Sequence, residues 1–379
     1  MSITPSVAVD TDKKPIMPIS NGKTLYVGGT GEDNYTTIQD AIDDASEGDT
    51  VFVYDESSPY EENVVVDKSI NLIGENKHKT IIDGDYKGDV ILVSADWVNI
   101  KGFTIQNSGS EWPNDAGIDV RSNFNKFSNN LILGNKIGLY TNSSYGNTII
   151  NNNISNNVNG ISLYHSGNNI LIGNNITDNY QHGIWLSTSN NNIISSNKIS
   201  FNGGGIGLYV STSNTIIGNT ITSNYKGSGI GARECYNINN ISSNTITHNF
   251  HGIYFYLASY QNFISNNISN NQMYGINLNS VEHIDIEGNN IERNEIGLGS
   301  LDCKSIFIVK NNFIKNDNQT IFDLFGSRYD SNYWSNWIGV RIKIPIFQKF
   351  PKILHCGFLS GFKFDWHPAK EPYNIEVVI

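Results

Sequence analysis

Cysteine is scarce in this chain of 379 residues, which has only Cys235, Cys303 and Cys356. The three are far apart and form neither a Cys-x-x-Cys pair nor an even-numbered set. Folds stapled by disulfides need such a pattern. The sequence therefore predicts no disulfide framework, and its cysteines do not define a redox compartment.

Long apolar runs are also missing, since none reaches the roughly 18 residues that a membrane-spanning helix needs. The most apolar late segment, IKIPIFQKFPKILHCGF, is interrupted by Lys, Gln and two prolines. At the start, MSITPSVAVD lacks a charged region and an apolar stretch, although Ser-Val-Ala suits the end of a signal peptide. We expect no transmembrane segment, a flexible segment over 1–23, and an extracellular or cell-surface protein whose signal peptide is truncated here.

Positive charge is in short supply, with 25 Lys and Arg against 36 Asp and Glu and a net charge of −11. Residues 31–62 contain eleven acidic residues and no Lys or Arg, whereas residues 340–370 carry an excess of basic residues. A globally acidic chain is a poor partner for nucleic acid. We therefore expect no nucleic-acid partner.

Proline is rare, at 9 residues, while glycine reaches 35 and asparagine 56. Gly and Asn tolerate the backbone of tight turns, so this balance favours repeated turns over a flexible linker. With 38% hydrophobic residues the chain can bury a large core. The abundance of asparagine therefore calls for a positional explanation.

A repeat of 21 to 25 residues supplies that explanation. Glycine followed by Ile or Leu recurs at Gly117, Gly138, Gly160, Gly183, Gly205, Gly229, Gly252, Gly275 and Gly297. Asparagine keeps step at Asn135, Asn157, Asn179, Asn202, Asn224, Asn249, Asn271, Asn294 and Asn316. Each unit contains three short alternating segments separated by Asn or Gly, which is typical of strands and turns. Three strands per 22 residues predict one coil of a parallel β-helix.

In stacked coils, equivalent residues lie above one another. The residue after each glycine, such as Ile161 or Ile184, is then predicted to form a core column, and the corner asparagines to form hydrogen-bonded ladders. Apolar residues at helical spacing predict an N-terminal capping helix over about 36–47, which would cover the open strand edge. We expect an all-β fold, with the parallel β-helix over 24–328 and a capping segment over 329–379 that holds Trp334, Trp337 and Trp366.

The chain resembles the right-handed parallel β-helix proteins of the pectin-lyase-like superfamily, and more closely the NosD-like repeat proteins. The residues that carry the resemblance are NYTTIQDAIDDASEGDTVFVY, DKSINLIGENKHKTIIDG, the repeated GI and NNI pairs, and SNYWSNW at 331–337. The resemblance covers about residues 24–337. It implies the right-handed fold and export from the cell.

Some members of that superfamily are polysaccharide lyases, glycoside hydrolases or epimerases, but their motifs are incomplete here. Arg341-Ile342-Lys343 matches the Arg-Ile-Lys of galacturonases without the accompanying aspartates and Gly-His-Gly. The Asp-Pro-His-Asp of alginate epimerases is replaced by Asp365-Trp366-His367-Pro368, which has a different order. NosD-like proteins often have an acidic calcium-type loop where this chain has IGVRIKIPIF. We therefore predict no calcium and no other cofactor.

The outward face of the glycine-anchored strands is the predicted functional surface, because function in such folds lies on exposed ladders and loops. If the first and third residues after each glycine are core, the second and fourth point outward. These positions include six aromatic residues: Tyr140, Tyr164, Trp185, Tyr209, Tyr254 and Tyr256. Rows of such rings among polar groups predict binding of a polysaccharide or cell-surface glycan. The alternative is that the rings only stabilise the ladder.

A polysaccharide-cleaving enzyme is the rival interpretation, and it needs paired acid/base groups. The candidate catalytic residues on the outward face are Asp115 and Asp119 beside Arg121, with Arg233 and Glu234 farther along. Asp115 and Asp119 flank Gly117 on one strand. Surface ion pairing is the alternative reading of both sets.

The histidines are considered as ligands of a copper site, because NosD-like proteins are associated with copper. His182 and His251 both precede repeat glycines, yet they stand three coils apart, or about 14 Å. That separation is too large for one ion, and the chain has only three Met. We therefore predict no metal site, and take a monomer as the default state.

Overall fold

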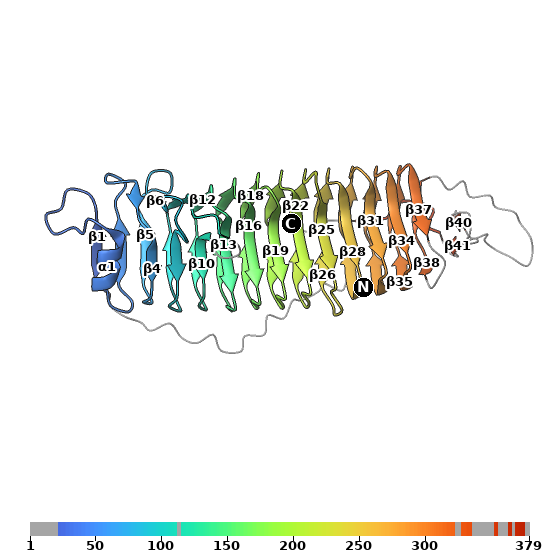
Figure 1. Ribbon diagram of the computed structural model, residues 1–379. Helices are drawn as coiled ribbons and strands as arrows, with labels where there is room; N and C mark the ends of the chain where they lie inside the picture. The colour runs from blue at the N-terminus through green and yellow to red at the C-terminus, as the bar shows by residue number, and fades with distance from the viewer. Residues whose placement is uncertain are drawn as a thin grey trace, which may run out of the picture.

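The computed structural model describes residues 22–111, 115–322, 327–335, 352–354, 363–365 and 368–375. These residues form a rod of stacked coils that begins at β1 (Thr24–Val27) and α1 (Ile38–Asp44) and continues along one axis (Figure 1). In the described part of the chain the strands make three sheets, of 12, 13 and 16 strands. All strand pairs are parallel except β40 (Lys352–Leu354) with β41 (Lys363–Asp365). The predicted parallel β-helix is confirmed.

The 12-stranded sheet, here called the glycine sheet, carries the repeat glycines. Its strands are β4 (Val64–Val66), β7 (Ile91–Val93), β10 (Ala116–Val120), β13 (Ile137–Asn142), β16 (Asn159–Tyr164), β19 (His182–Ser187), β22 (Gly204–Tyr209), β25 (Ser228–Arg233), β28 (His251–Tyr256), β31 (Tyr274–Asn279), β34 (Ile296–Leu301) and β37 (Asn318–Phe322). The other two sheets contribute mostly three-residue strands, such as β17 (Ile170–Ile172) and β18 (Asn175–Thr177). Strands β16, β17 and β18 thus form one coil.

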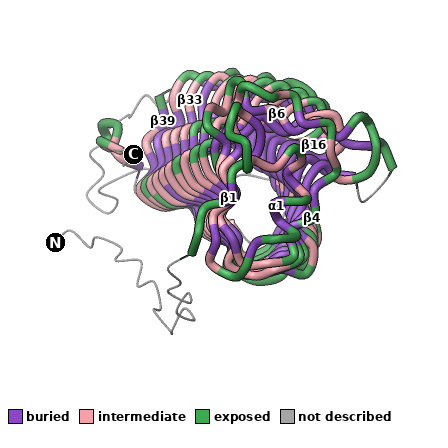
Figure 2. Tube along the Cα trace, turned by 90° about the vertical axis from the view of Figure 1, so that its left-hand side faces the viewer, coloured by how far each residue is buried: buried purple, intermediate pink, exposed green. Residues whose placement is uncertain are grey.

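The register follows the sequence repeat coil by coil. Ile161 pairs with Ile184, and Ile184 pairs with Ile206 on the next coil. All three are buried, and their column belongs to one continuous hydrophobic core along the rod (Figure 2). The glycines recur because the coils approach closely there: a Cβ on Gly138 would lie 2.6 Å from the carbonyl oxygen of Gly160. Glycine is therefore required by space between the backbones.

Buried asparagines form the predicted ladders. The backbone N–H of Asn157 donates to Oδ1 of Asn179 at 3.1 Å, and the N–H of Asn179 donates in the same way to Asn202 at 3.0 Å. The side-chain amide of Asn157 donates to the carbonyl of Ile132 on the preceding coil at 3.1 Å. Because the side chain of each of these asparagines satisfies a backbone N–H and a backbone carbonyl of the preceding coil, the excess of asparagine is structural.

The capping helix α1 lies at the N-terminal end of the rod, at one side of the central opening and next to β4 (Figure 2). Its residues Ile38, Ala41 and Ile42 are fully buried against the first coils. Thr37 caps the helix by accepting from the N–H of Asp40 at 3.1 Å. The carboxylate of Glu62 accepts from the N–H of Ile38 at 2.9 Å. Helix α1 is shorter than the expected 36–47, because Thr37 is its N-cap and Ala45 its extended C-cap.

At the far end, the buried ring of Trp334 stacks on Phe313 with 4.4 Å between ring centroids. Its indole N–H donates to Oδ2 of Asp365 at 3.0 Å, which ties β41 to the last coil. Trp337, Trp366 and the Arg341-Ile342-Lys343 triplet lie outside the described residues. Among the residues that are described, no helix has the length and apolar character to span a membrane.

Candidate functional site

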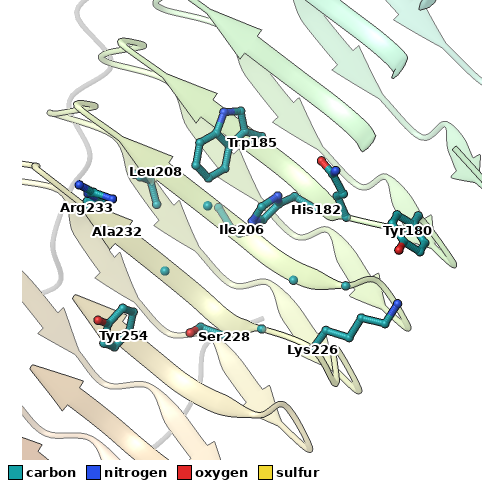
Figure 3. A pocket seen from close by; sticks show the side chains of 16 residues that line it. Tyr180, His182, Trp185, Ile206, Leu208, Lys226, Ser228, Ala232, Arg233 and Tyr254 are labelled. Carbon is teal, nitrogen blue, oxygen red and sulfur yellow. The ribbon is translucent and has the colours of Figure 1, made fainter. Parts of the chain in front are cut away.

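The outward face of the glycine sheet is hollowed between Trp185 on β19 and Tyr254 on β28. The register places Trp185 beside Gly207, Gly207 beside Gly231, and Gly231 beside Tyr254 on four successive coils. Two neighbouring coils therefore have no side chain at the outward position, whereas an aromatic ring stands on either side. This hollow is called the groove from here on (Figure 3).

The two glycines of the groove have different roles. A Cβ on Gly207 would lie 2.6 Å from Cζ3 of Trp185, so the indole rests against the backbone of the next coil. A Cβ on Gly231 would meet nothing nearer than 3.7 Å, so the space above it is open. Gly207 leaves room for the indole of Trp185, which forms one wall of the groove. Gly231 forms the open floor.

The groove has a volume of about 450 Å³, which lies in the range of ordinary ligand sites. Its described lining contains no carboxylate, and its walls combine aromatic rings with polar groups such as Ser228 and Gln181. The ring of His182 lies 4.7 Å from that of Trp185. Burial lowers the pKa of His182, so the imidazole is neutral near pH 7. Between its two ends, the groove thus offers a neutral aromatic lining.

A cation stands at each end of the groove. Lys226, in the corner before β25, places its ammonium 4.4 Å from the ring centroid of Tyr180. Arg233, the last residue of β25, pairs with Glu234 at 2.9 Å and lies over the ring of Tyr256 at 5.7 Å. Both cations are exposed. The charge of Arg233 is balanced by Glu234, whereas Lys226 forms no ion pair among the described residues.

The structure brings together only some of the predicted glycan-binding residues. Trp185 and Tyr254 line the groove. Tyr209 and Tyr256 flank Arg233 on the neighbouring coils, at one end of the groove. Tyr164 is 42% exposed but lies outside it, with its ring 4.2 Å from that of His165.

The structure corrects the predicted exposure of Tyr140, which is only 6% exposed. Its ring packs with Ala116 and Ile137, which precede the repeat glycines on their own coils and also point away from the main core. Burial, followed by the nearby carboxylate of Asp119, raises the pKa of Tyr140 to about 12. The simple outward rule fails here because outward apolar residues of neighbouring coils cover one another.

The candidate catalytic residue Asp119 is fully buried. It accepts from Arg121 at 2.7 and 2.8 Å through one oxygen, while its other oxygen, Oδ1, has no donor among the described residues. Asp89 lies beside it, within 3.8 Å of Arg121, and accepts from the N–H of Ala116 at 2.8 Å. Asp89, Asp119, Arg121 and Tyr140 are called the acidic cluster.

Asp89 and Asp119 act as a coupled pair. Burial and the neighbouring Asp119 carboxylate raise the pKa of Asp89 to about 7, and burial also raises the pKa of Asp119. A proton held on Asp89 would supply the donor that Oδ1 of Asp119 lacks. Because Asp119 is fully buried, the cluster is a contact between neighbouring coils, and its carboxyl groups hold a proton more tightly than exposed carboxyl groups do.

The remaining catalytic candidates form local contacts. Asp115 lies on the loop before β10, where its carboxylate accepts from the N–H of Glu111 at 2.7 Å. It is therefore part of that loop's hydrogen bonding. Arg233 and Glu234 form an exposed ion pair, as the surface reading expected.

Sequence reasoning missed Gly207, Gly231, Lys226 and Asp89. The two glycines could have been found by aligning the repeats, because they are the positions that break the outward column between Trp185 and Tyr254. Lys226 and Asp89 carry no such signal, since each lies in a connection outside the strand pattern.

A family profile described as "Periplasmic copper-binding protein (NosD)" matches residues 42–249 and 226–342, which together span most of the chain. No curated protein sequence matches the chain.

The described residues do not fit a copper site. No three His, Cys, Asp or Glu side chains gather in a metal-binding group in the part of the chain that the structure describes. Cys235 and Cys303 are buried with their thiols directed at backbone carbonyls. His182 and His251 are separated by two intervening coils, and burial lowers the pKa of both.

Solved structures share the fold at low sequence identity. The A-module of the mannuronan C-5 epimerase AlgE6 from Azotobacter vinelandii matches with a TM-score of 0.60 and 16% identity, covering 79% of this chain and 93% of the module. XylC in complex with xylose gives 0.57 and 12%, covering 82% and 83%. The Dettilon tailspike protein gives 0.53 and 16%, covering 82% and 66%. With the family profile matched over most of its length, this chain belongs to the NosD family, and it shares the parallel β-helix fold with these solved structures.

Proposed function

We propose that this protein is an exported, non-catalytic β-helix protein that binds a polysaccharide on the outward face of the glycine sheet, with the groove as its binding site. The observation that carries the proposal is the open floor over Gly231 between the rings of Trp185 and Tyr254. Flat amphipathic rings present an apolar face to sugar C–H groups, while Ser228 and Gln181 are able to bind hydroxyls.

The lining supports binding over bond cleavage. Glycoside hydrolysis uses two carboxyl groups about 5 to 9.5 Å apart, and no carboxylate lines the described groove. The coupled pair of Asp89 and Asp119 lies on other coils, where Asp119 is closed to solvent. The related structures include proteins named for mannuronan and for bound xylose, which supports a sugar ligand, and the family description supports export to the periplasm.

The experiment fills the groove without touching its walls. Gly231→Leu places a side chain in the open space, and Asn277→Leu is its matched control, because Asn277 is the next outward position beyond Tyr254. On a polysaccharide array we expect wild type and Asn277→Leu to be retained equally, and Gly231→Leu to lose at least tenfold in affinity. Melting temperatures of all three should agree.

Two results would contradict the proposal. Retention of Gly231→Leu at wild-type affinity would place binding elsewhere, and the absence of any retained polysaccharide would remove the binding function. Release of new reducing ends or unsaturated products by wild type from a retained polysaccharide would instead favour the rival polysaccharide-cleaving enzyme.

A further inference from the structure

We propose that a second copy of this chain docks on the outward face of the 16-stranded sheet, so that two rods pack face to face with their axes antiparallel. The contact is made by a strip of isoleucines in the middle of the rod, on a different sheet from the groove. The inference does not depend on the proposed polysaccharide binding, and it replaces the monomer that is expected by default.

The strip lies on four successive strands of the 16-stranded sheet: β14 (Thr148–Ile150), β17, β20 (Ile193–Ser195) and β23 (Thr215–Ile217). The central residue of each strand is fully buried in the core, so the first and third residues point outward. The register stacks these outward positions in two columns along the rod axis. Most of them are partly buried isoleucines, which are called the isoleucine strip: Ile150, Ile170, Ile172, Ile193 and Ile217.

The 13-stranded sheet shows that the fold does not require isoleucine at such positions. On the same four coils its strands are β15 (Asn153–Ser155), β18, β21 (Lys198–Ser200) and β24 (Thr220–Thr222). Their central residues are buried isoleucines, whereas their outward positions hold Asn, Ser, Thr or Lys. Threonine has the β-branched shape that strands favour without presenting a wholly apolar surface. The isoleucines on the outward face of the 16-stranded sheet therefore indicate a surface that another molecule covers.

Opposite charges stand beyond the two ends of the strip. Lys126, on β11 (Lys126–Ser128), precedes Thr148 in one outward column, and Asp285, on β32 (Glu282–Glu287), lies farther along the same column. On the strands between them, both outward columns are free of charged residues. Lys126 and Asp285 are exposed, and neither forms an ion pair with another described residue. Glu287, in the second column, is balanced by Lys310 at 3.0 Å.

These charges select the antiparallel arrangement. With parallel rods, Lys126 would face the same lysine of the second copy, and Asp285 the same aspartate. The sheet order from β11 to β32 contains eight strands, so a two-fold axis between β20 and β23 places β11 opposite β32 of the second copy. Lys126 of each copy then faces Asp285 of the other, and the two isoleucine strips meet between these contacts. Because a two-fold contact of one surface with itself is closed, it gives a dimer and no filament.

The size of this face predicts a weak dimer. The strands from β11 to β32 span roughly 34 Å at about 4.8 Å between neighbouring strands. A strip of that length and about 15 Å in width buries about 1,000 Å² in total on the two copies, which is at the low end for specific interfaces. We therefore expect a dissociation constant in the micromolar range. The described lining of the groove includes no residue of this face, so the dimer leaves both grooves open.

Sedimentation velocity tests the interface, with the full chain at concentrations from about 1 to about 200 μM. We expect wild type to shift from monomer to dimer over this range. Thr215→Asp places a carboxylate opposite Ile193 of the second copy, and should weaken dimerisation at least tenfold because a charge is buried without a partner. Thr220→Asp is the matched control, because it is the same change at the first position of the next strand, on the 13-stranded sheet. It should dimerise as wild type does, and melting temperatures of both variants show whether the fold is kept.

Charge reversal tests the antiparallel arrangement. Lys126→Asp and Asp285→Lys each place like charges at both end contacts, and each alone should weaken dimerisation about tenfold. Both changes in one chain should restore wild-type affinity, because every contact again joins opposite charges. With parallel rods, each single reversal would leave like charges opposite each other as before, and affinity would not fall.

Several results would overturn the proposal. A wild type that stays monomeric up to the highest concentration would leave the isoleucine strip to a different protein. A dimer that Thr215→Asp leaves at wild-type affinity would lie on another face. Single reversals without effect, or a combined variant that does not recover, would exclude the antiparallel contact. The groove is tested separately by Gly231→Leu, so either proposal can fail while the other holds.

Discussion

Two patches on the glycine sheet use equivalent outward positions in opposite ways. In the groove, Gly231 leaves its position empty and the rings of Trp185 and Tyr254 stand open. In the acidic cluster, Tyr140 and Asp119 fill their positions and exclude solvent. The backbone and its register are the same in both patches, so side-chain size at single positions decides whether a coil offers a ligand site or a sealed contact. A repeat fold thereby acquires a local site without altering its scaffold.

The strongest test of this comparison measures both stability and polysaccharide binding in one variant from each patch. Tyr140→Ala removes a buried ring from over Ala116 and Ile137, and should lower the free energy of unfolding by about 3 kcal/mol. Trp185→Ala removes a partly buried wall of the groove, and should lower polysaccharide affinity at least tenfold, while the free energy of unfolding falls by only about 1 kcal/mol. Denaturant unfolding and polysaccharide retention measure the two effects. Loss of binding in Tyr140→Ala at unchanged stability would reverse the assignment of the patches.

The two glycines of the groove give a smaller effect. Gly207→Ala forces its Cβ against the indole of Trp185, which should destabilise the protein by about 1 to 3 kcal/mol and displace the wall. Gly231→Ala meets only open space, so its stability should remain within about 0.5 kcal/mol of wild type. The shift in tryptophan fluorescence reports the displaced ring, with Gly231→Ala as the control. If both variants behave alike, Gly207 and Gly231 do not have the separate roles assigned to them.

The acidic cluster predicts a change of stability with pH around neutrality. The pKa of Asp89 is raised to about 7 in the folded protein from an ordinary value of 3.8, so the folded state holds the proton more tightly than the unfolded state. Its contribution to stability is full below about pH 4 and is lost as the pH rises through 7. The free energy of unfolding should therefore fall between about pH 4 and about pH 7 through this pair, and level off above.

Asp89→Asn should remove that pH dependence. The amide donates to Oδ1 of Asp119 at any pH, and its own oxygen still accepts from the N–H of Ala116. At pH 8 the variant should be more stable than wild type by about 1 to 2 kcal/mol, because a buried acceptor regains a donor. Glu234→Gln, at an exposed ion pair, is the control and should leave the pH profile unchanged. An unaltered profile in Asp89→Asn would show that the two aspartates do not share a proton.

Much of the fold could be predicted because equivalent residues of a solenoid recur in the sequence at the length of one coil. The glycine and asparagine columns appear in the chain at the spacing at which they stack, so the core column from Ile161 to Ile206 and the ladder through Asn157 and Asn179 were readable directly. Exposure on the outward face was harder to predict from the sequence. The rule for outward positions placed Tyr140 in solvent, and it gave no weight to a glycine at an outward position.

The sequence by itself determined the parallel β-helix, its three short strands per coil, the buried asparagine ladders and the helix that covers the first coil. These features depend on local turn chemistry and on a period of about 22 residues, and both can be recognised in the amino-acid sequence. Only the tertiary structure decided which outward residues are open. That choice depends on contacts between coils: the indole of Trp185 lying on Gly207, the ring of Tyr140 covering Ala116 and Ile137, and Asp89 meeting Asp119 from the preceding coil. Residues more than twenty positions apart in the chain become neighbours only when the coils stack, so their combined size and charge cannot be read from either one alone.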